Sequence, residues 1–483
     1  MLSESELVRE RKSKREAYLK EGISPYGSRF LPIDSISEIL GLFEEGKRVR
    51  LAGRIMARRS HGKSTFCDLK DEGGKIQIYT KEDILGAEGY EKFSRLDIGD
   101  IIGAEGSLFV SKVGEKTLKV EKFALLSKIL QVLPEKWHGL KDVETRYRQR
   151  YVDLIVNEEV RKTFRFRSQI MAEIRHFLDS RGFLEVETPM MQPIPGGARA
   201  RPFVTHHETL HTDLYLRVAP ELYLKRVLVG GMEKIYEINR NFRNEGISVR
   251  HNPEFTMLEL YQAYADYSDM MTLTEELITS LAKGVNAGEE IVYGDRKMSF
   301  KRPWKRVPFY PALMDKTKVD WRKADIKKEA RRLGVEFDPA DETIDVLNAV
   351  FETFIEPDLW DPTFVIDYPA ELTPLAKPKD DDPQLAYRFE LYIGKLEIAN
   401  AFSELNDPVI QRQRLEKQVE IIGSNKKVDE DFLTALEYGM PPAGGLGIGI
   451  DRLVMILTNR PSIREVILFP QLRPETRGQK EES

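Results

Sequence analysis

The chain has 483 residues, of which 41% are hydrophobic and 32% are charged, and its formal net charge at pH 7 is −5. This composition excludes a disordered or fibrous protein, a membrane span of about 18 apolar residues and a generic basic nucleic-acid binder, although a local basic patch stays possible. The N-terminus lacks the apolar stretch of a secretory signal and Cys67 is the single cysteine, which excludes an internal disulfide and a cysteine-clustered zinc site and predicts a cytoplasmic protein.

The first third of the chain is expected to hold a charged extension and a small β domain. Residues 1–46 predict an N-terminal helical extension, whose first 20 residues carry a solvated charged face or, alternatively, a weak contact to an RNA backbone. Residues 47–130 contain about five short β segments separated by glycine-containing turns. This spacing predicts a small barrel or sandwich, with an OB-type barrel as the first choice.

A larger second domain is expected after a polar linker at residues 131–159. It opens with an amphipathic helix around 160–181, which carries an apolar stripe and ends at Gly182. The strand FLEVETP follows. Residues 268–356 predict a helical insertion without visible chemistry, and the last third returns to strands and closes with a glycine-rich strand–helix unit.

Two motif matches are set aside because their surroundings are wrong. His207–His211 spells HExxH, but its flanks predict strands, whereas a zinc protease needs both histidines on one stable helix. Gly62-Lys63-Ser64 resembles the end of a phosphate-binding loop, but the required first glycine is Ala57. The glycine-rich segment 444–451 never spells GxGxxG, so a dinucleotide fold is not supported.

Three segments carry the chemistry. Residues 234–264 predict a strand, a polar loop and a second strand. Side chains alternate along a strand with a period of two, which places an arginine, an aromatic ring, a carboxylate and a phenol on the same face of the predicted sheet. Residues 388–407 contain Glu390 and Glu397 around a turn at Gly394, which suits Mg²⁺ beside phosphates or, alternatively, a plain exposed hairpin.

In a regular strand the side chains of Glu397 and Asn400 would point to opposite faces. Glu397 can therefore belong to the same site as Asn400 only if the strand contains a bulge or begins after Glu397. In the third segment, residues 445–458, Arg452 lies just inside a helix. There it either meets a phosphate or forms a surface salt bridge.

Three stretches of the chain resemble the three signature motifs of class II aminoacyl-tRNA synthetases: GFLEVETP at residues 182–189, FRNE through RHNPEF, and GLGIGIDR. The N-terminal barrel resembles that of subclass IIb. The segments HGLKDVETRYRQRYVDL, LYLRVAPELYLKR and EIANAFSELNDP resemble its lysyl-tRNA synthetases, from about residue 45 to the end. The resemblance implies an α+β protein with an OB-fold anticodon-binding domain at 47–130 and a class II catalytic domain at 160–483, an antiparallel sheet flanked by helices.

The resemblance also implies a function and partners. The protein would attach L-lysine to tRNA(Lys) with ATP, through a lysyl-adenylate, as a cytoplasmic homodimer joined through the first motif and without a membrane partner. The implied cofactor is Mg²⁺ held by Glu390 and Glu397, and no zinc is implied. Arg243 would bridge the α-phosphate and the lysine carboxylate, and Arg452 would hold the γ-phosphate and cover one adenine face. The remaining implied ATP contacts, with Phe255 stacked on the adenine, are Glu245, His251, Asn252, Phe255 and Glu390.

The implied amino-acid pocket suits a cation. Glu221, with the backbone near Gly197, would take the α-ammonium, and Glu259, Tyr261 and Glu404 would surround the ε-ammonium. Three carboxylates in one cavity repel one another unless a cation enters, which favours lysine over aspartate. The implied lysine-binding set is Gly197, Glu221, Glu259, Tyr261, Asn400, Phe402 and Glu404.

The resemblance places anticodon reading on the barrel, where Phe66 would stack on a base with Arg59 and Gln77 nearby. The alternative for Phe66 is a core aromatic of the barrel. Three alternatives remain for the whole chain. They are an aspartate or asparagine enzyme with a basic pocket, a non-catalytic RNA-binding relative, and a relative that lysylates a protein.

Overall fold

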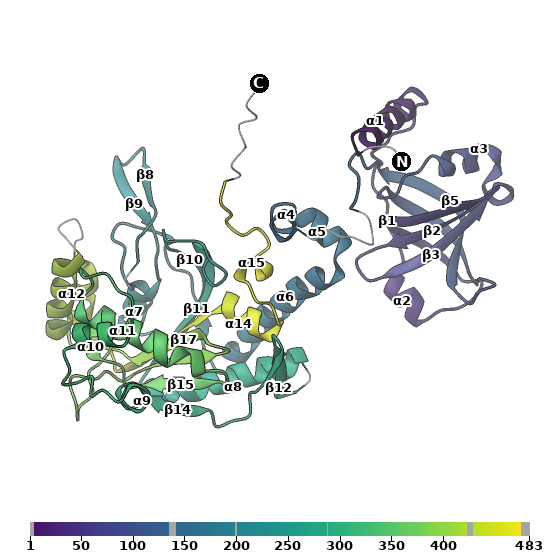
Figure 1. Ribbon diagram of the computed structural model, residues 1–483. Coiled ribbons are helices and arrows are strands. Elements are labelled where there is room, and N and C mark those ends of the chain that lie inside the picture. Colours follow the sequence, from purple (N-terminus) through teal and green to yellow (C-terminus); the bar gives the residue numbers. More distant parts are fainter. Residues whose placement is uncertain (1–3, 135–141, 199, 287, 423–427, 475–483) are drawn as a thin grey trace, which may run out of the picture. The chain divides into compact units, whose positions relative to one another are not determined.

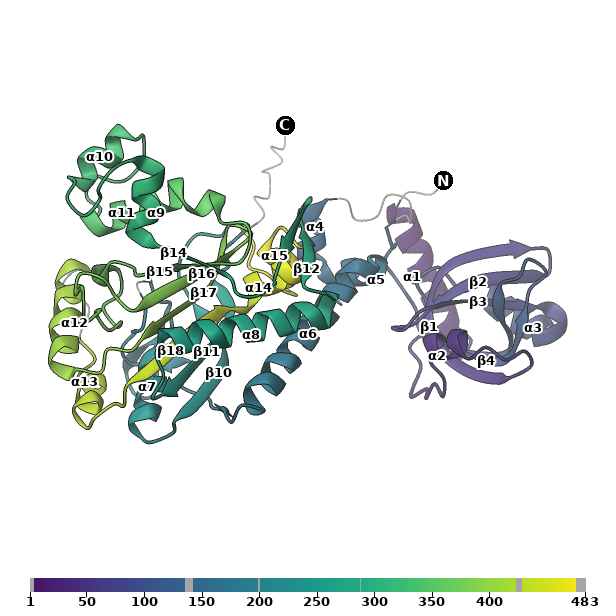
Figure 2. The same cartoon turned by 90° about the horizontal axis from the view of Figure 1, so that it is seen from below.

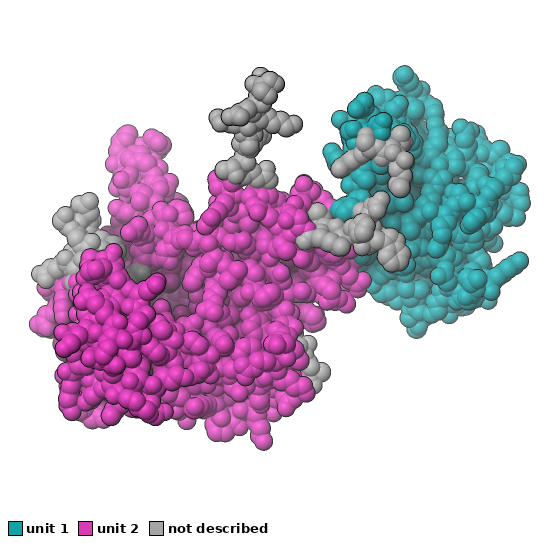
Figure 3. Space-filling view, in the orientation of Figure 1, with its two compact units in different colours: residues 1–141 teal, residues 142–483 magenta. Residues whose placement is uncertain are grey.

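The computed structural model describes residues 4–134, 142–198, 200–286, 288–422 and 428–474 (Figure 1). The chain divides into two compact units, residues 1–141 and residues 142–483, coloured separately in Figure 3. No helix within the described ranges has both the length and the apolar character that crossing a bilayer requires.

The first unit contains a closed five-stranded barrel with the strand order β1-β2-β3-β5-β4. Alternate residues of β1, such as Val49, Leu51 and Ile55, point into a buried apolar core. The five predicted β segments and the OB-type barrel are thereby confirmed. The strands are β1 (Arg48–His61), β2 (Ser64–Lys70), β3 (Lys75–Lys81), β4 (Ile101–Val110) and β5 (Lys116–Ser127).

Three helices accompany the barrel. The predicted N-terminal helix is α1 (Glu4–Lys20), and residues 1–3 of that prediction lie outside the described residues. It is not merely solvated, because Lys14 Nζ lies 2.7 Å from Asp97 Oδ1 and Arg11 donates to the Ile98 carbonyl at 3.2 Å. The other two helices, α2 (Ile36–Gly41) and α3 (Glu82–Ser94), were not predicted.

The predicted linker is partly helical. Residues 135–141 lie outside the described residues, and α4 (Val143–Arg148) and α5 (Arg150–Val156) follow them within the second unit. The buried Arg150 donates to Asp153 at 2.7 Å and to the carbonyls of Arg464 at 2.7 Å and Leu468 at 3.1 Å. This arginine therefore attaches the segment to the C-terminal part of the unit.

The second unit is built on an eight-stranded sheet in the order β14-β15-β16-β17-β18-β11-β10-β6. Neighbouring strands are antiparallel except at the two edges, where β14–β15 and β10–β6 pair in parallel. The predicted α+β class is confirmed. The strands are β6 (Leu184–Glu185), β10 (Lys234–Phe242), β11 (Glu254–Ala263), β14 (Lys305–Pro308), β15 (Thr363–Ile366), β16 (Arg388–Ile393), β17 (Leu396–Ser403) and β18 (Ala443–Gly449).

One face of this sheet packs against α6 (Glu158–Asp179), α8 (Tyr267–Asn286) and α14 (Ile450–Leu457), with α6 and α8 side by side (Figure 2). The helix predicted around 160–181 is therefore confirmed as α6. Leu258, Leu260 and Ile448 point into this helix-covered core. Because side chains alternate along a strand, their sequence neighbours point to the opposite face.

The segment 268–356 is more than a helical insertion. Its predicted helices are present in α8 and α10 (Ile326–Arg332), together with α9 (Phe309–Thr317) and α11 (Thr343–Phe354). It also contains the hairpin strands β12 (Glu290–Tyr293) and β13 (Arg296–Ser299) and the edge strand β14 of the main sheet. The helix α8 belongs to the main core, so part of this segment is integral to the sheet.

The HExxH segment lies in a β-hairpin, as expected from its flanks. β8 (Val204–His207) pairs antiparallel with β9 (Thr212–Leu216), and β9 also pairs with β7 (Met191–Gln192). His211 has a φ of 47°, which ends the turn rather than continuing a helix. The two histidines are therefore not one helical turn apart, as the zinc-protease chemistry would need.

Candidate active site

The face of the sheet opposite α6 and α8 is polar in its central strands. β18 lies between β11 and β17, and its residues Gly445 and Gly447 are paired with Tyr261 and Glu259 on one side and with Phe402 and Asn400 on the other. At these two positions β18 has no side chain on this face and forms the floor, and the side chains of its two neighbours form the walls. A Cβ at Gly445 would overlap Glu404 Oε1 and Tyr261 Cε1, so only glycine allows this close approach.

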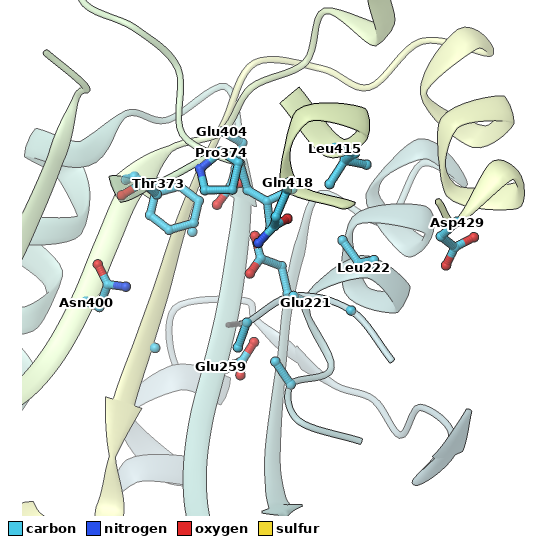
Figure 4. Close-up of a pocket in the computed structure, with 18 of the residues that line it drawn as sticks. Glu221, Leu222, Glu259, Thr373, Pro374, Asn400, Glu404, Leu415, Gln418 and Asp429 are labelled. Atoms are coloured by element: carbon cyan, nitrogen blue, oxygen red, sulfur yellow. The ribbon is translucent and has the colours of Figure 1, made fainter. Parts of the chain in front are cut away.

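A cavity of about 300 Å³ opens above this floor (Figure 4). Arg243 lines it from the end of β10, and Glu221 lines it from the start of α7 (Glu221–Val229). Gly197, with a φ of 89°, approaches Ala219 and Glu221. All seven residues expected to hold lysine line this one cavity: Gly197, Glu221, Glu259, Tyr261, Asn400, Phe402 and Glu404.

The carboxylates of this cavity are buried and affect one another. Burial, with the nearby charges of Glu221 and Glu237, raises the pKa of Glu259 to about 8. Burial also raises the pKa of Glu404 to about 8, against the opposing effect of Lys225. Both groups are therefore poised to lose a proton when a cation enters.

Lys225 contacts two of these carboxylates, and the sequence analysis missed it. Its side chain is 0% exposed, and its Nζ lies 2.7 Å from Glu221 Oε1 and forms a second ion pair with Glu404 Oε2. Burial disfavours the ammonium, but Glu221 and Glu404 outweigh burial and raise the pKa of Lys225. The expectation that only an entering cation offsets the three carboxylates is therefore incomplete.

A second cavity of about 140 Å³ lies next to the first. Arg243, Met257, Asn400 and Gly447 line both cavities, so the two share a wall that contains the guanidinium of Arg243. The residues expected to contact ATP or Mg²⁺ that line this cavity are Arg243, Glu245, His251, Asn252, Phe255, Glu397 and Arg452.

Arg452 connects two candidate residues rather than forming only a surface salt bridge. It donates to the Glu397 carbonyl at 2.8 Å and lies 3.3 Å from the Glu397 carboxylate. Burial and the charge of Arg452 lower the pKa of His251. The ring is then neutral near pH 7, and its Nε2 accepts a hydrogen bond from Arg452 at 3.1 Å.

Asn252 has partners inside the protein. It donates to the Glu254 carbonyl at 2.6 Å and accepts from the Gln471 backbone at 3.1 Å.

Asp451, at the start of α14, accepts from the Thr256 backbone at 2.7 Å and from Arg167 at 2.6 Å. These contacts fasten the start of α14, and with it Arg452, to β11 and α6. The sequence offered no signal for Arg167.

Glu390 and Glu397 lie on the same face of their hairpin because β17 is bulged. Glu390 pairs with Asn400 and Tyr392 pairs with Glu397, so Ile398 is the additional residue that corrects the parity. The Glu390 side chain is 12% exposed, which excludes the plain exposed hairpin for this residue. Burial and the charge of Glu397 raise the pKa of Glu390, and Arg388, Tyr368 and Tyr392 oppose this. A cation held by both carboxylates would oppose this rise in the pKa of Glu390.

Glu390 itself lines neither cavity. Arg388, two residues earlier on the same face, lines the larger cavity and contacts both Glu390 and Asn400 Oδ1, the latter at 3.0 Å. Arg388 was not predicted, although its i, i+2 spacing from Glu390 on a strand was a usable signal. It connects the amino-acid side of the site to the carboxylate pair.

On the barrel, the three predicted anticodon residues share one outer face. Arg59 pairs with Phe66, Phe66 with Tyr79, and Asp68 with Gln77 across three strands. Phe66 is half-buried, and its ring centroid lies 4.6 Å from that of Tyr79, outside the core of the barrel. The alternative of a core aromatic is therefore not supported.

Two family models match the chain. The tRNA synthetases class II (D, K and N) match residues 142–473, and the OB-fold nucleic acid binding domain matches residues 49–126. The chain therefore belongs to the class II tRNA synthetases of the D, K and N group. The resemblance drawn from the three motifs is confirmed.

Curated relatives are similar over almost the whole chain. A lysine--tRNA ligase of Carboxydothermus hydrogenoformans is 57% identical over 482 residues, covering 97% of this chain and 98% of that protein. The lysine--tRNA ligase of Pelotomaculum thermopropionicum is also 57% identical, covering 97% of this chain and 95% of that protein. The lysine--tRNA ligase of Syntrophomonas wolfei is 54% identical over 490 residues, covering 98% of this chain and 99% of that protein.

Proposed function

We propose that this protein is an ATP-dependent lysine–tRNA ligase that attaches L-lysine to tRNA(Lys) through a lysyl-adenylate. The observation that carries the proposal is the wall shared by the two cavities. Arg243 lines both the cavity with three carboxylates and the cavity with the ATP candidates. A guanidinium in that position meets the lysine carboxylate on one side and the α-phosphate on the other.

In the first step, a lysine carboxylate oxygen attacks the α-phosphorus of ATP and pyrophosphate leaves. In the second step, a terminal ribose hydroxyl of the tRNA takes the lysyl group and AMP leaves. No side chain forms a covalent bond, so the protein acts by positioning and charge stabilisation. Arg243 holds the two reacting groups together, and Arg452 holds the terminal phosphate.

The other site residues hold the substrates. Phe255 stacks on the adenine, with Glu245 near its amino group and His251 and Asn252 near the phosphates. Mg²⁺ bound by Glu390 and Glu397 would neutralise charge on the phosphate oxygens. The two same-face carboxylates, whose charges interact, support this assignment of the cofactor.

The amino-acid cavity favours lysine over the other substrates of the D, K and N group. Glu259 and Glu404 occupy the places where an aspartate or asparagine enzyme would need a basic side chain. Arg243, Glu390 and Arg452 are all present, which disfavours a non-catalytic relative. The barrel is present as well, which disfavours a relative that lysylates a protein.

We also propose a cytoplasmic homodimer joined through the GFLEVETP segment. β6 in this segment is a two-residue strand at one edge of the main sheet. Leu184, Met190 and Met191 around it are 52%, 43% and 55% exposed. A short edge strand with exposed apolar neighbours suits an isologous interface. Sedimentation would detect a dimer, and Leu184→Glu should shift it toward monomer.

Amino-acid-dependent exchange of labelled pyrophosphate into ATP, measured with each of the twenty amino acids, tests the proposed activity. Exchange should occur with lysine and stay at background with aspartate and asparagine. Subsequent charging of a tRNA pool should load tRNA(Lys). Exchange with another amino acid, or none with lysine, would overturn the proposal.

A further inference from the structure

The buried ammonium of Lys225 contacts the site already described but has no role in it so far. Lys225 follows Glu221 by four residues on α7, so both side chains lie on one face of that helix. Glu404 reaches the same ammonium from the end of β17. The Nζ also lies 5.5 Å from the centroid of the Phe402 ring. Lys225 is not among the residues that line the cavity, so its ammonium lies behind the two carboxylates.

The charges of the cavity match those of lysine only when Lys225 is counted. Glu221, Glu259 and Glu404 carry three formal negative charges, and Lys225 reduces them to two. Three other charged residues are not part of this sum. Glu237 pairs with Arg217 at 2.6 Å, and Arg388 and Asp429, which line the cavity, pair with Glu390 and Arg226. The substrate brings two ammonium groups to these carboxylates and one carboxylate to Arg243. Without Lys225, one carboxylate would remain unbalanced in a buried site.

We propose that Lys225 is a positioning residue for lysine recognition, which fixes the carboxylates of Glu221 and Glu404 and sets the charge of the pocket to that of two ammonium groups. This role presupposes lysine as the substrate, as proposed above. Glu221 and Glu404 come from different elements, a helix start and a strand end, and Lys225 is the group that both contact. It therefore couples the part of the pocket expected to hold the α-ammonium to the part expected to hold the ε-ammonium.

The variants Lys225→Met and Lys225→Gln test this role. Met keeps most of the side-chain volume without charge, and Gln keeps a hydrogen-bond donor without charge. The KM values for lysine and for ATP are measured by pyrophosphate exchange at pH 6.5 and pH 8.5. The control is Lys283→Met, because Lys283 is a 56% exposed lysine on α8 that should leave both KM values unchanged.

We expect both variants to raise the lysine KM roughly tenfold at pH 6.5 and by less than about threefold at pH 8.5. The ATP KM should stay within about twofold. The pH dependence arises because Lys225 holds down the pKa of the Glu404 carboxyl. Without Lys225 that pKa rises, so lysine binding must expel a proton from the pocket, and this costs more free energy at the lower pH. An equal rise in the lysine KM at both pH values, or a parallel rise in the ATP KM, would mean a merely structural role.

Calorimetry on the unmodified protein keeps the proposal testable if neither variant folds. Lysine binding is measured at pH 8.5 in two buffers that differ in ionisation enthalpy. Because Lys225 favours the ionised form of Glu404, lysine binding at pH 8.5 should release less than about one proton. Release of one proton or more would show that Lys225 does not keep these carboxylates ionised, and would overturn its role. A wrong assignment of function is distinguishable, because lysine would then neither bind nor support exchange in the unmodified protein.

Discussion

At the scale of single residues, the proposed recognition of lysine depends on carboxylates that are costly to bury. Glu404 has a side chain that is 0% exposed, and Glu259 is 6% exposed as a residue. Such groups gain most from a partner that brings the opposite charge, because water does not screen the interaction. An uncharged isostere of lysine would leave them unpaired, and this is how a buried polar site rejects near-cognate substrates.

Glu404→Gln should therefore weaken lysine activation strongly while ATP binding persists. We expect the kcat/KM for lysine in pyrophosphate exchange to fall roughly 10²- to 10³-fold, which corresponds to about 3–4 kcal/mol for the loss of a buried charge partner. Equilibrium binding of ATP should be unchanged. Glu290→Gln, at a 68% exposed side chain on β12, serves as the control. Lysine-dependent exchange at the unmodified rate would remove Glu404 from the pocket.

The affinity for lysine should also rise with pH. Glu259 and Glu404 have pKa values raised to about 8 in the free protein, so both are mostly protonated at pH 7. A bound ammonium favours the ionised form and lowers these pKa values, so binding releases protons. The Kd for lysine should therefore decrease between pH 6.5 and pH 8.5. Calorimetric titration measures this directly, and a Kd that is constant over that range would contradict the raised pKa values.

At the scale of elements, two backbone features assemble the site from strands. The bulge at Ile398 turns Glu397 to the face of Glu390 and Asn400. β18 lies between β11 and β17, and because its Gly445 has no side chain, the side chains of Glu404 and Tyr261 both lie close above it. Both features change the geometry of the sheet without adding a functional group.

Gly445→Ala should test the glycine floor. The added Cβ would overlap Glu404 Oε1 and Tyr261 Cε1, so both side chains must move. Because displacements of about 1 Å at a reacting centre cost up to roughly 10²-fold in rate, we expect a loss of that size in kcat/KM for lysine. Gly284→Ala is the matched control, since a Cβ there meets nothing within 4 Å. Unaltered exchange by Gly445→Ala would show that the floor tolerates a methyl group.

These same elements show how far sequence reasoning reaches. Alternation in 234–264 predicted the polar face correctly, because a strand with one buried face has a strict period of two. The parity conflict at Glu397 indicated that a bulge was needed, but a bulge has no residue code and its position required the structure. The helix α3 was missed because Gly86 has a φ of 75° inside it and breaks the helical pattern. The burial of Lys225 could not be predicted, because its ion-pair partner Glu404 lies far away in the sequence.

At the scale of the whole molecule, chemistry and RNA reading are assigned to different compact units. The cavities and both candidate catalytic arginines belong to residues 142–483, whereas Arg59, Phe66 and Gln77 belong to residues 1–141. The small negative net charge of −5 is partly explained by the carboxylates of the catalytic unit. Carboxylates gather where lysine and Mg²⁺ are proposed to bind, and the barrel needs only a local surface for the RNA.

Phe66→Ala should therefore separate the two steps of the reaction. Lysine-dependent pyrophosphate exchange requires no tRNA and should keep its unmodified rate, since Phe66 lies in the other unit. Loss of one stacking interaction is worth about 1–3 kcal/mol, so the kcat/KM for tRNA should fall roughly 5- to 150-fold. Thermal unfolding checks the barrel, because Phe66 packs on Tyr79 with ring centroids 4.6 Å apart. Equal losses in exchange and charging, with a lowered Tm, would mean that Phe66 supports folding rather than RNA binding.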